Sequence, residues 1–294
     1  MTNPPRPTAR LVWTGCLAAA TLLLGGCMLH ASVPVHPPPP PPPPPPPSAV
    51  ASAPPAPAPP PENSPEVVDL LEKHIAAIGG REALSAIRTV DTQREAEVHK
   101  AIQHSHEIRD RTDGRFYSKT DGPRGTVEIG FDGKRVWQKS PFFRGYLPET
   151  DPGVKNLSRR HAELFEYQEA GQKFAKLSSE TVGGKQLLVL YTQSTEFDPQ
   201  GRETSVKYYF DPDSFLLRRM VIGSEIAQTI DFDDYREVAG TKVPFSSTAT
   251  NSNATVRSTI KSIQYNVPLD QRVFEYQPPT PPAAAPRAGG GASG

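Results

Sequence analysis

Proline is unevenly distributed along this chain, and its distribution limits which part can fold. The sequence has 35 prolines, and most of them lie before residue 65 or after residue 277. Proline fixes the backbone angle φ and lacks an amide donor, so segments made almost entirely of Pro, Ala and Ser cannot build an apolar core. Residues 64–276 are therefore the part that can fold, and their length suits one domain.

Charge and cysteine content exclude several functional classes. The chain has 32 Lys and Arg and 32 Asp and Glu, and no basic run is long enough to form a nucleic-acid-binding surface. The two cysteines, Cys16 and Cys27, both lie in the N-terminal apolar segment. The folding part therefore has no disulfide, no thiol nucleophile and no cysteine-ligated zinc. We expect no nucleic-acid partner, no metal and no other cofactor.

The N-terminal segment has the composition of a signal peptide. Arg6 and Arg10 precede an apolar run of about 14 residues, whereas a membrane-spanning helix needs roughly 20. The following "LGGC", residues 24–27, resembles the lipobox of bacterial lipoproteins. That resemblance implies that 1–26 is a lipoprotein signal peptide and that Cys27 is lipidated after cleavage. A plain secretory signal with a chance cysteine and a marginal membrane helix are the alternatives.

Acyl chains on Cys27 would anchor the chain to a membrane. Each buried CH2 group contributes about 0.8 kcal/mol, so two or three chains such as palmitate hold a protein where one would not. Met28 after the cysteine resembles lipoproteins that are released to the outer membrane. This implies an envelope protein at the outer membrane that faces the periplasm, with the cell surface as the alternative.

Proline-rich segments flank the folding part on both sides. Residues 27–63 comprise the predicted lipidated Cys27 and a Pro/Ala-rich spacer. Within it, residues 37–61 predict polyproline II, in which each residue adds about 3.1 Å. Residues 277–294 are rich in Pro, Ala and Gly and predict a disordered tail. The spacer would hold the domain at a distance from the membrane.

The folding part opens with a helical pattern. Ser64 suits the N-cap and Pro65 the first helical position, apolar residues recur at helical spacing, and Gly79 ends the helix. Residues 81–87 predict one or two further helical turns.

Strand patterns fill most of the remainder. Between Val90 and Ile263, about ten or eleven segments alternate apolar and polar residues, while residues 157–168 interrupt the series and predict a helix. Helices do not alternate with strands, which argues against a parallel α/β fold. We predict a mainly β (α+β) domain with a large curved antiparallel sheet, open or partly closed, and helices against one face.

Three stretches resemble LolA/LolB-like periplasmic proteins, which act in outer-membrane lipoprotein sorting. They are "LLEKHIAAIGGREALSAIRTV", "KYYFDPDSFLLRRM" and "DFDDYREVAGTKVPFSSTAT", and the resemblance covers residues 65–276. It implies an unclosed β half-barrel with helices packed on its concave face. It also implies an apolar concavity that receives the acyl chains of lipoproteins or other envelope lipids.

The predicted strands carry apolar residues on one face, and a large sheet with one apolar face needs a cover. One helix and one mid-chain connection would cover it only in part, which leaves a cleft. The aromatic stretches "SPFFRGYL" and "ELFEY" predict a movable lid, and ordinary helix-to-sheet packing is the alternative. The predicted cavity or lid residues are Phe131, Phe142, Phe143, Tyr146, Leu164, Phe165, Tyr167, Tyr208, Phe210 and Ile230.

A few polar residues are predicted to face the same cavity. His104 and His106 alternate with polar neighbours and share the apolar side of their strand, and Arg94 points inward by the same parity. Arg94 would pair with a ligand headgroup or with Asp110. A metal bound by the histidines would need further ligands that the sequence does not supply, and a strand solvated on both sides is the other alternative.

The chain has no G-x-S-x-G nucleophile motif and no phosphate-binding loop. We therefore expect a non-enzymatic, monomeric domain of a membrane-anchored envelope lipoprotein that binds lipid, lipoprotein acyl chains or another apolar ligand. It would act as a carrier, acceptor or sensor. The alternatives are a tethered protein-binding or structural module without lipid cargo, and an unrecognised hydrolase.

Overall fold

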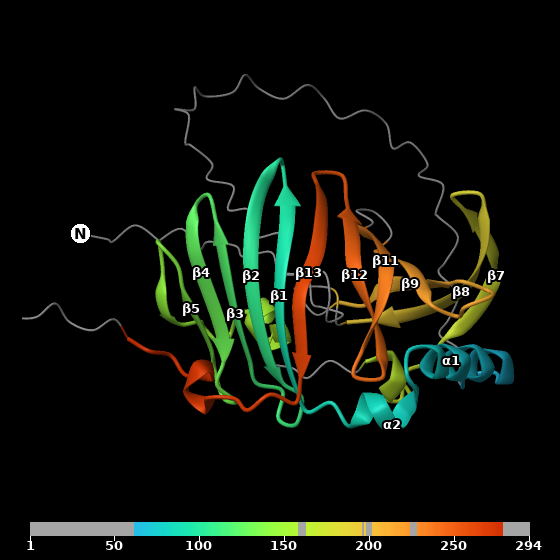
Figure 1. The fold of residues 1–294 in the computed structure, drawn as a ribbon, viewed down its shortest axis with the longest axis horizontal. Coiled ribbons are helices and arrows are strands. Elements are labelled where there is room, and N and C mark those ends of the chain that lie inside the picture. Colours follow the sequence, from blue (N-terminus) through green and yellow to red (C-terminus); the bar gives the residue numbers. More distant parts are fainter. Residues whose placement is uncertain (1–61, 158–162, 196, 198–201, 224–227, 279–294) are drawn as a thin grey trace, which may run out of the picture.

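The computed structural model describes residues 62–157, 163–195, 197, 202–223 and 228–278 (Figure 1). The predicted signal peptide, the lipidation site Cys27, nearly all of the spacer and the tail beyond residue 278 lie outside these ranges. They remain predictions. Within the described ranges, no helix is both long enough and apolar enough to cross a membrane.

The dominant element is a single antiparallel sheet of 13 strands. The strands are β1 (Thr89–Val98), β2 (Ala101–Asp110), β3 (Phe116–Gly122), β4 (Gly125–Phe131), β5 (Val136–Lys139), β6 (Arg144–Tyr146), β7 (Ala175–Val182), β8 (Lys185–Ser194), β9 (Thr204–Phe210), β10 (Leu217–Ile222), β11 (Gln228–Val238), β12 (Thr241–Thr250) and β13 (Thr255–Tyr265). Their order is β6-β5-β4-β3-β2-β1-β13-β12-β11-β10-β9-β8-β7, so β6 and β7 are separate edges. Figure 1 shows the sheet curved but not closed, which confirms the predicted half-barrel.

The chain enters this sheet at its centre. It runs outward from β1 to the edge strand β6, crosses to the opposite edge and returns strand by strand from β7 to β13. There β13 pairs with β1, with Val90 opposite Tyr265 and Val98 opposite Val256. The two halves of the sheet are therefore joined by the first and last strands of the chain.

The crossing connection contains α3 (Pro152–Leu157) and the 3-10 turn η1 (Leu164–Glu166). The single helix predicted at 157–168 is wrong where the structure describes it. Glu163 has an extended backbone, with φ −80° and ψ 161°, and its side chain forms a reciprocal capping box with Glu166. An extended residue cannot lie inside a helix, so a new short element begins at this point.

Two helices precede the sheet and lie along one end of its strands (Figure 1). They are α1 (Pro65–Ala77) and α2 (Gly80–Ser85). Gly79 between them has φ +127°, and a Cβ there would lie 2.6 Å from the carbonyl oxygen of Gly240. The amide of Lys242 also donates to the carbonyl of Ile78 at 3.0 Å. Glycine at 79 is therefore what allows the helices to meet the turn between β11 and β12.

The apolar residues of the sheet gather mainly on one face, which we call the inner face and which carries Ala96 and Phe116. Ala96 lies opposite Gln103, and Arg109 lies opposite Phe116. Gln103 and Arg109 are an even number of residues apart on β2, so all four side chains share one face.

Two apolar clusters occupy the inner face. The large cluster joins α1, α2 and η1 to β1 and β8–β13. The small cluster joins β3–β5 to Val154 of α3. Helices thus pack on the inner face at two separate places, as expected for a half-barrel of this class.

Candidate functional site

The part of the inner face between the two clusters is mostly polar, although the buried Ile260 lies opposite Arg94 within it. We call it the polar band and define it by the buried side chains of Thr92, Arg94, Ser118, Ser247 and Ser258. Ser118 lies opposite Ile129 of the small cluster, and Ser258 lies opposite Ala96 of the large cluster. Arg94 lies between them, two residues from Ala96 on β1. The band therefore runs diagonally from one apolar cluster to the other.

Two hydroxyl groups of the band are buried without a hydrogen-bond partner, the Oγ atoms of Ser118 and Ser258. Their residues are 2% and 5% exposed. Buried polar groups are nearly always hydrogen-bonded, because an unpaired one costs its desolvation free energy. The inner face therefore contains donors that the described protein atoms leave unused.

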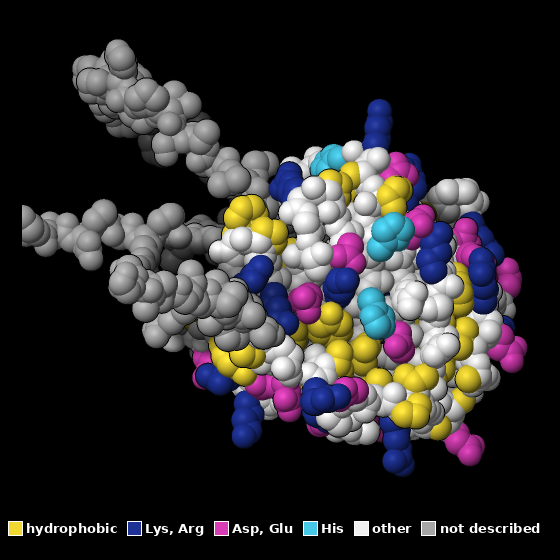
Figure 2. All heavy atoms as spheres, turned by 60° about the vertical axis from the view of Figure 1, so that its left-hand side comes forward, with side chains coloured by type: hydrophobic (Ala, Val, Ile, Leu, Met, Phe, Trp, Pro, Cys, Tyr) yellow, Lys and Arg dark blue, Asp and Glu magenta, His cyan; other side chains and the backbone are white. Residues whose placement is uncertain are grey.

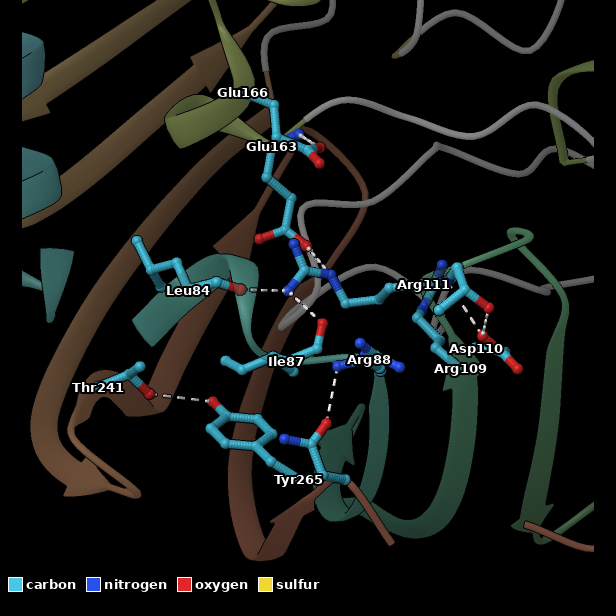
Figure 3. Close-up of polar contacts among 12 residues, drawn as sticks. Leu84, Ile87, Arg88, Arg109, Asp110, Arg111, Glu163, Glu166, Thr241 and Tyr265 are labelled. Carbon is cyan, nitrogen blue, oxygen red and sulfur yellow. Dashed lines mark hydrogen bonds and ion pairs between the residues drawn. The ribbon is translucent and has the colours of Figure 1, made fainter. Parts of the chain in front are cut away.

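Contacts around Arg111 join α2 to the crossing connection (Figure 3). Its Nη1 donates to the carbonyl oxygens of Leu84 and Ile87, at 3.0 and 3.2 Å. Its Nε lies 3.2 Å from a carboxylate oxygen of Glu163, and its guanidinium stacks on the ring of Phe165. Arg111 thus satisfies carbonyls at the C-terminal end of α2 and holds the crossing connection against it.

A second arginine fastens the same connection to α1. Arg81 donates to both carboxylate oxygens of Glu72 and to the carbonyl oxygen of Phe165. The hydroxyl of Tyr167 donates to Glu72 at 2.9 Å. The hydrogen bonds from Arg81 hold the pKa of the Glu72 carboxyl below its usual range. The segment around η1 is therefore fixed by two cationic side chains in addition to apolar packing.

A buried histidine anchors α1 to the sheet. His74 is 4% exposed, its Nδ1 lies 2.8 Å from the carbonyl oxygen of Phe215, and its ring packs edge-on against Phe210. Burial lowers its pKa to about 4, although the bond to the Phe215 carbonyl opposes that shift. His74 is therefore neutral at pH 7 and donates from Nδ1.

Several predicted ligand-binding residues lie in the inner-face clusters. Phe165, Tyr167, Tyr208, Phe210 and Ile230 belong to the large cluster. Phe131 belongs to the small cluster. Arg94 also faces inward, in the polar band. The binding roles of all these residues remain proposals.

The stretch "SPFFRGYL" is not a lid over the inner face. Residues 144–146 form the edge strand β6, and the hydroxyl of Ser140 accepts the amides of Phe142 and Phe143 in the turn before it. Phe142 is 83% exposed and Phe143 is 40% exposed. Tyr146 lies opposite Trp137, on the outer face, because its strand pairs with β5. Strand pairing, rather than packing across the sheet, decides the position of this segment.

His104 and His106 point away from the inner face, contrary to the prediction. They lie opposite Glu95 and Gln93, whose side chains alternate with inward-facing Arg94. His106 instead contacts Asp91 on the outer face, with Nε2 2.9 Å from the carboxylate. The prediction placed the histidines inward because they share one side of the strand with apolar residues. One of these, Ile102, is 48% exposed on the outer face. Figure 2 shows histidine, acidic and basic side chains mixed on this surface.

The arrangement of the described side chains supports neither a metal site nor a catalytic serine–lysine pair. In the described ranges, no group of three or more His, Cys, Asp or Glu side chains is arranged to hold a metal ion. Ser258 and Lys261 have the S-x-x-K spacing of some acyl-enzymes. However, Ser258 faces inward, while Nζ of Lys261 lies 3.3 Å from Glu95 on the outer face.

The sequence reading missed the serines of the polar band and the role of Arg111. Single small polar residues in alternating strands carry little signal, since solvent-facing positions look the same. Ser118 is two residues from Phe116, so both side chains lie on the same face of β3, and this spacing could have indicated that Ser118 faces inward. Arg111 directly follows β2, and nothing in the local sequence indicates that its side chain binds the carbonyls of Leu84 and Ile87.

No family model and no curated protein matches this chain. Solved structures to which it is similar include a domain described as outer membrane lipoprotein-sorting, from Vibrio parahaemolyticus, with 11% identity and a TM-score of 0.48 over 71% of this chain and 95% of that one. Another is a DUF1329 family protein from Desulfovibrio piger, with 10% identity and a TM-score of 0.47 over 71% and 97%. A third is a LolA superfamily protein from Nitrosomonas europaea, with 12% identity and a TM-score of 0.46 over 70% and 96%. At 10–12% identity and TM-scores below 0.5, these similarities do not assign a function to this chain.

Proposed function

We propose that this protein is a membrane-anchored envelope lipoprotein whose half-barrel binds a lipid, a lipoprotein acyl chain or another amphiphile on its inner face. The observation that carries this proposal is the division of the inner face into two apolar clusters with a buried polar band between them. An apolar core that served only folding would gain nothing from buried, unpaired hydroxyl groups across its middle.

The open sheet suits such a ligand physically. The edges β6 and β7 are not joined, so the concavity can widen without breaking a ladder of backbone hydrogen bonds. Ligand sites are typically apolar surfaces with a few placed polar groups, and the inner face has this composition. The protein would act as a carrier, acceptor or sensor for the ligand.

The anchoring part of the proposal comes from the sequence. Lipidation at Cys27 would fix the chain to the envelope, most simply at the outer membrane facing the periplasm. The segment 28–61 would then set the distance between the membrane and the domain.

Ligand binding is tested by purifying the full chain from bacterial envelopes and extracting bound lipid for mass spectrometry. We expect lipid in near-stoichiometric amounts. In a second measurement, delipidated protein should take up a fluorescent phospholipid from vesicles. Protein that carries no lipid and takes up none would refute the proposal, provided that circular dichroism shows the β-rich fold to be intact.

One observation favours a second candidate, a tethered protein-binding module. The turn before β6 exposes Phe142 and Phe143 beside an unpaired sheet edge, and exposed aromatic residues at an edge are suited to a partner. Cross-linking in intact cells from position 142 would capture one stoichiometric protein in this case. Lipid uptake would then be unaffected by Phe142→Ser.

A further inference from the structure

We propose that the end of the sheet remote from α1 and α2 is a membrane-docking surface. Its apolar side chains would enter the headgroup region of an anionic bilayer, and its cations would contact lipid phosphates. We call this end the rim and define it by six exposed residues, Lys100, Ile102, Arg124, Phe142, Phe143 and Arg144. The rim is separate from the inner face, so it does not depend on the ligand proposed there.

The rim carries every large apolar side chain that is exposed in the described ranges. These side chains are Ile102, Phe142 and Phe143, with exposed fractions of 48%, 83% and 40%. Single exposed apolar residues scattered over a surface are ordinary and need no explanation. Their concentration at one end of a sheet instead indicates a surface that contacts something apolar.

The strand order brings these residues to one end. Consecutive antiparallel strands turn at alternate ends, so the turns 99–100, 123–124 and 140–143 lie at the same end. Figure 1 shows the tips of β1–β2 and β3–β4 at the top and the helices at the bottom. A Cβ on Gly125, which begins β4, would lie 3.0 Å from the side chain of Pro141. The second and third turns are therefore in contact.

The rim is cationic. Its three turns contain no Asp or Glu, and Lys100, Arg124 and Arg144 lie in them or directly after them. Within the described part of the chain, these three side chains form no ion pair. An anionic partner would neutralise them.

Two carboxylates lie close behind the rim, and each has a cation beside or opposite it. The carboxylate of Asp121 lies 3.1 Å from Nζ of Lys119. Glu97 lies between Ile102 and Arg257 on the neighbouring strands. These carboxylates therefore do not cancel the charge of the three unpaired cations.

A bilayer interface accepts both kinds of side chain. Aromatic residues settle in the headgroup region, and Lys and Arg are attracted to anionic lipids. The first and third turns belong to β2 and β5, which are three strands apart, so the apolar groups spread over about 15 Å. A protein partner would need a shaped surface of about 800 Å² to cover separate turns, whereas a fluid bilayer adapts to them. The anchor proposed at Cys27 would hold the rim near such a surface.

The proposal is tested by flotation with vesicles of phosphatidylcholine alone or mixed with phosphatidylglycerol. The protein begins at residue 28, which removes the predicted signal peptide and acylated cysteine and keeps every described residue. We expect it to bind the vesicles that contain phosphatidylglycerol, and added salt should weaken this binding because the charges are exposed.

Two variants probe the two kinds of contact. Phe142→Ser should weaken vesicle binding about tenfold, the effect of no longer burying one large apolar side chain. Arg124→Gln should weaken it about fivefold, the effect of one cation near an anionic surface. Lys134→Gln is the matched control, because it removes an exposed cation from the turn between β4 and β5, at the opposite end. It should bind as the wild type does, and all three variants should keep the wild-type melting temperature.

The proposal is overturned if the wild-type protein floats with neither kind of vesicle, or if Phe142→Ser and Arg124→Gln bind as Lys134→Gln does. A photoreactive group at position 142 in intact cells should capture phospholipid, and capture of one stoichiometric protein instead would also overturn it. Binding of a fluorescent phospholipid supplied in detergent micelles tests the inner face separately. Phe142→Ser should leave this binding unchanged, so either surface can fail without the other.

Discussion

The indole Nε1 of Trp137 donates a hydrogen bond of 2.6 Å to the carbonyl oxygen of Phe274, in the 3-10 turn η2 (Gln271–Phe274). Trp137 is 1% exposed and Phe274 is fully buried. Because Trp137 lies on the outer face of β5, the bond fastens the C-terminal segment across the outside of the sheet. The ring fits only because residue 130, directly opposite on β4, is glycine.

We predict that Gly130→Ala destabilises the domain. A Cβ at this position would lie 2.5 Å from the Trp137 ring, and overpacking of this kind typically costs about 1–3 kcal/mol. Urea unfolding followed by tryptophan fluorescence would measure the loss. Gly122→Ala on β3 is the matched control, since its Cβ would meet only the flexible side chain of Gln103 at 3.3 Å. Equal stabilities of the two variants would contradict this account of the Trp137 site.

Acid should destabilise the protein through His74. Its pKa is about 4 in the folded state and near 6.5 when unfolded, so between these values the unfolded chain binds the proton preferentially. The stability from neutral His74 is complete above pH 6.5 and is lost as pH falls to 4, by about 3 kcal/mol at ~1.4 kcal/mol per pKa unit.

This pH effect can be isolated with His74→Gln, which keeps a donor for the Phe215 carbonyl but does not titrate. Between pH 7 and pH 4, the variant should lose about 3 kcal/mol less free energy of unfolding than the wild type. His104→Gln, which removes an exposed histidine of β2, is the matched control. If the free energy of unfolding falls with pH equally in the wild type and in His74→Gln, His74 does not have this role.

Loss of Arg111 should free the crossing connection from α2. Arg111→Leu removes the side-chain donor to the carbonyls of Leu84 and Ile87 and the ion pair with Glu163. We expect a cost of about 1–3 kcal/mol and faster amide hydrogen exchange at residues 163–167. Arg88→Leu removes a neighbouring but exposed arginine and should leave exchange in this segment unchanged. If both variants exchange alike, Arg111 does not hold the connection.

Cys27→Ser should release the protein from the membrane fraction. Without the thiol there is no site for a diacylglyceryl group, and the contribution of about 0.8 kcal/mol per buried CH2 group is lost. Cell fractionation, with mass spectrometry of the N-terminal peptide, measures both effects. Cys16→Ser is the control, because the predicted cleavage removes residue 16 with the signal peptide. A Cys27→Ser protein that stays in membranes would contradict lipid anchoring at this residue.

The fold class followed from local information. The alternation of apolar and polar residues between Val90 and Ile263 placed most of the strands, and Gly79 marked the end of the first helix. The strand β6 was missed because three residues carry no periodicity. The helix at 157–168 was predicted from the absence of strand rhythm, which does not distinguish a helix from an irregular connection.

The sequence by itself determined that the described part of the chain forms a large antiparallel sheet and that the apolar side of this sheet needs a cover. Period and proline content depend only on neighbours along the chain. Only the tertiary structure decided which side of each strand faces inward. A side chain of β2 points inward or outward according to its register with β1, so His104 turned outward while Arg94 turned inward. The pairing of β1 with β13 also brought Ser258 onto the face of Ser118, because residues far apart in the sequence meet only after the sheet has formed.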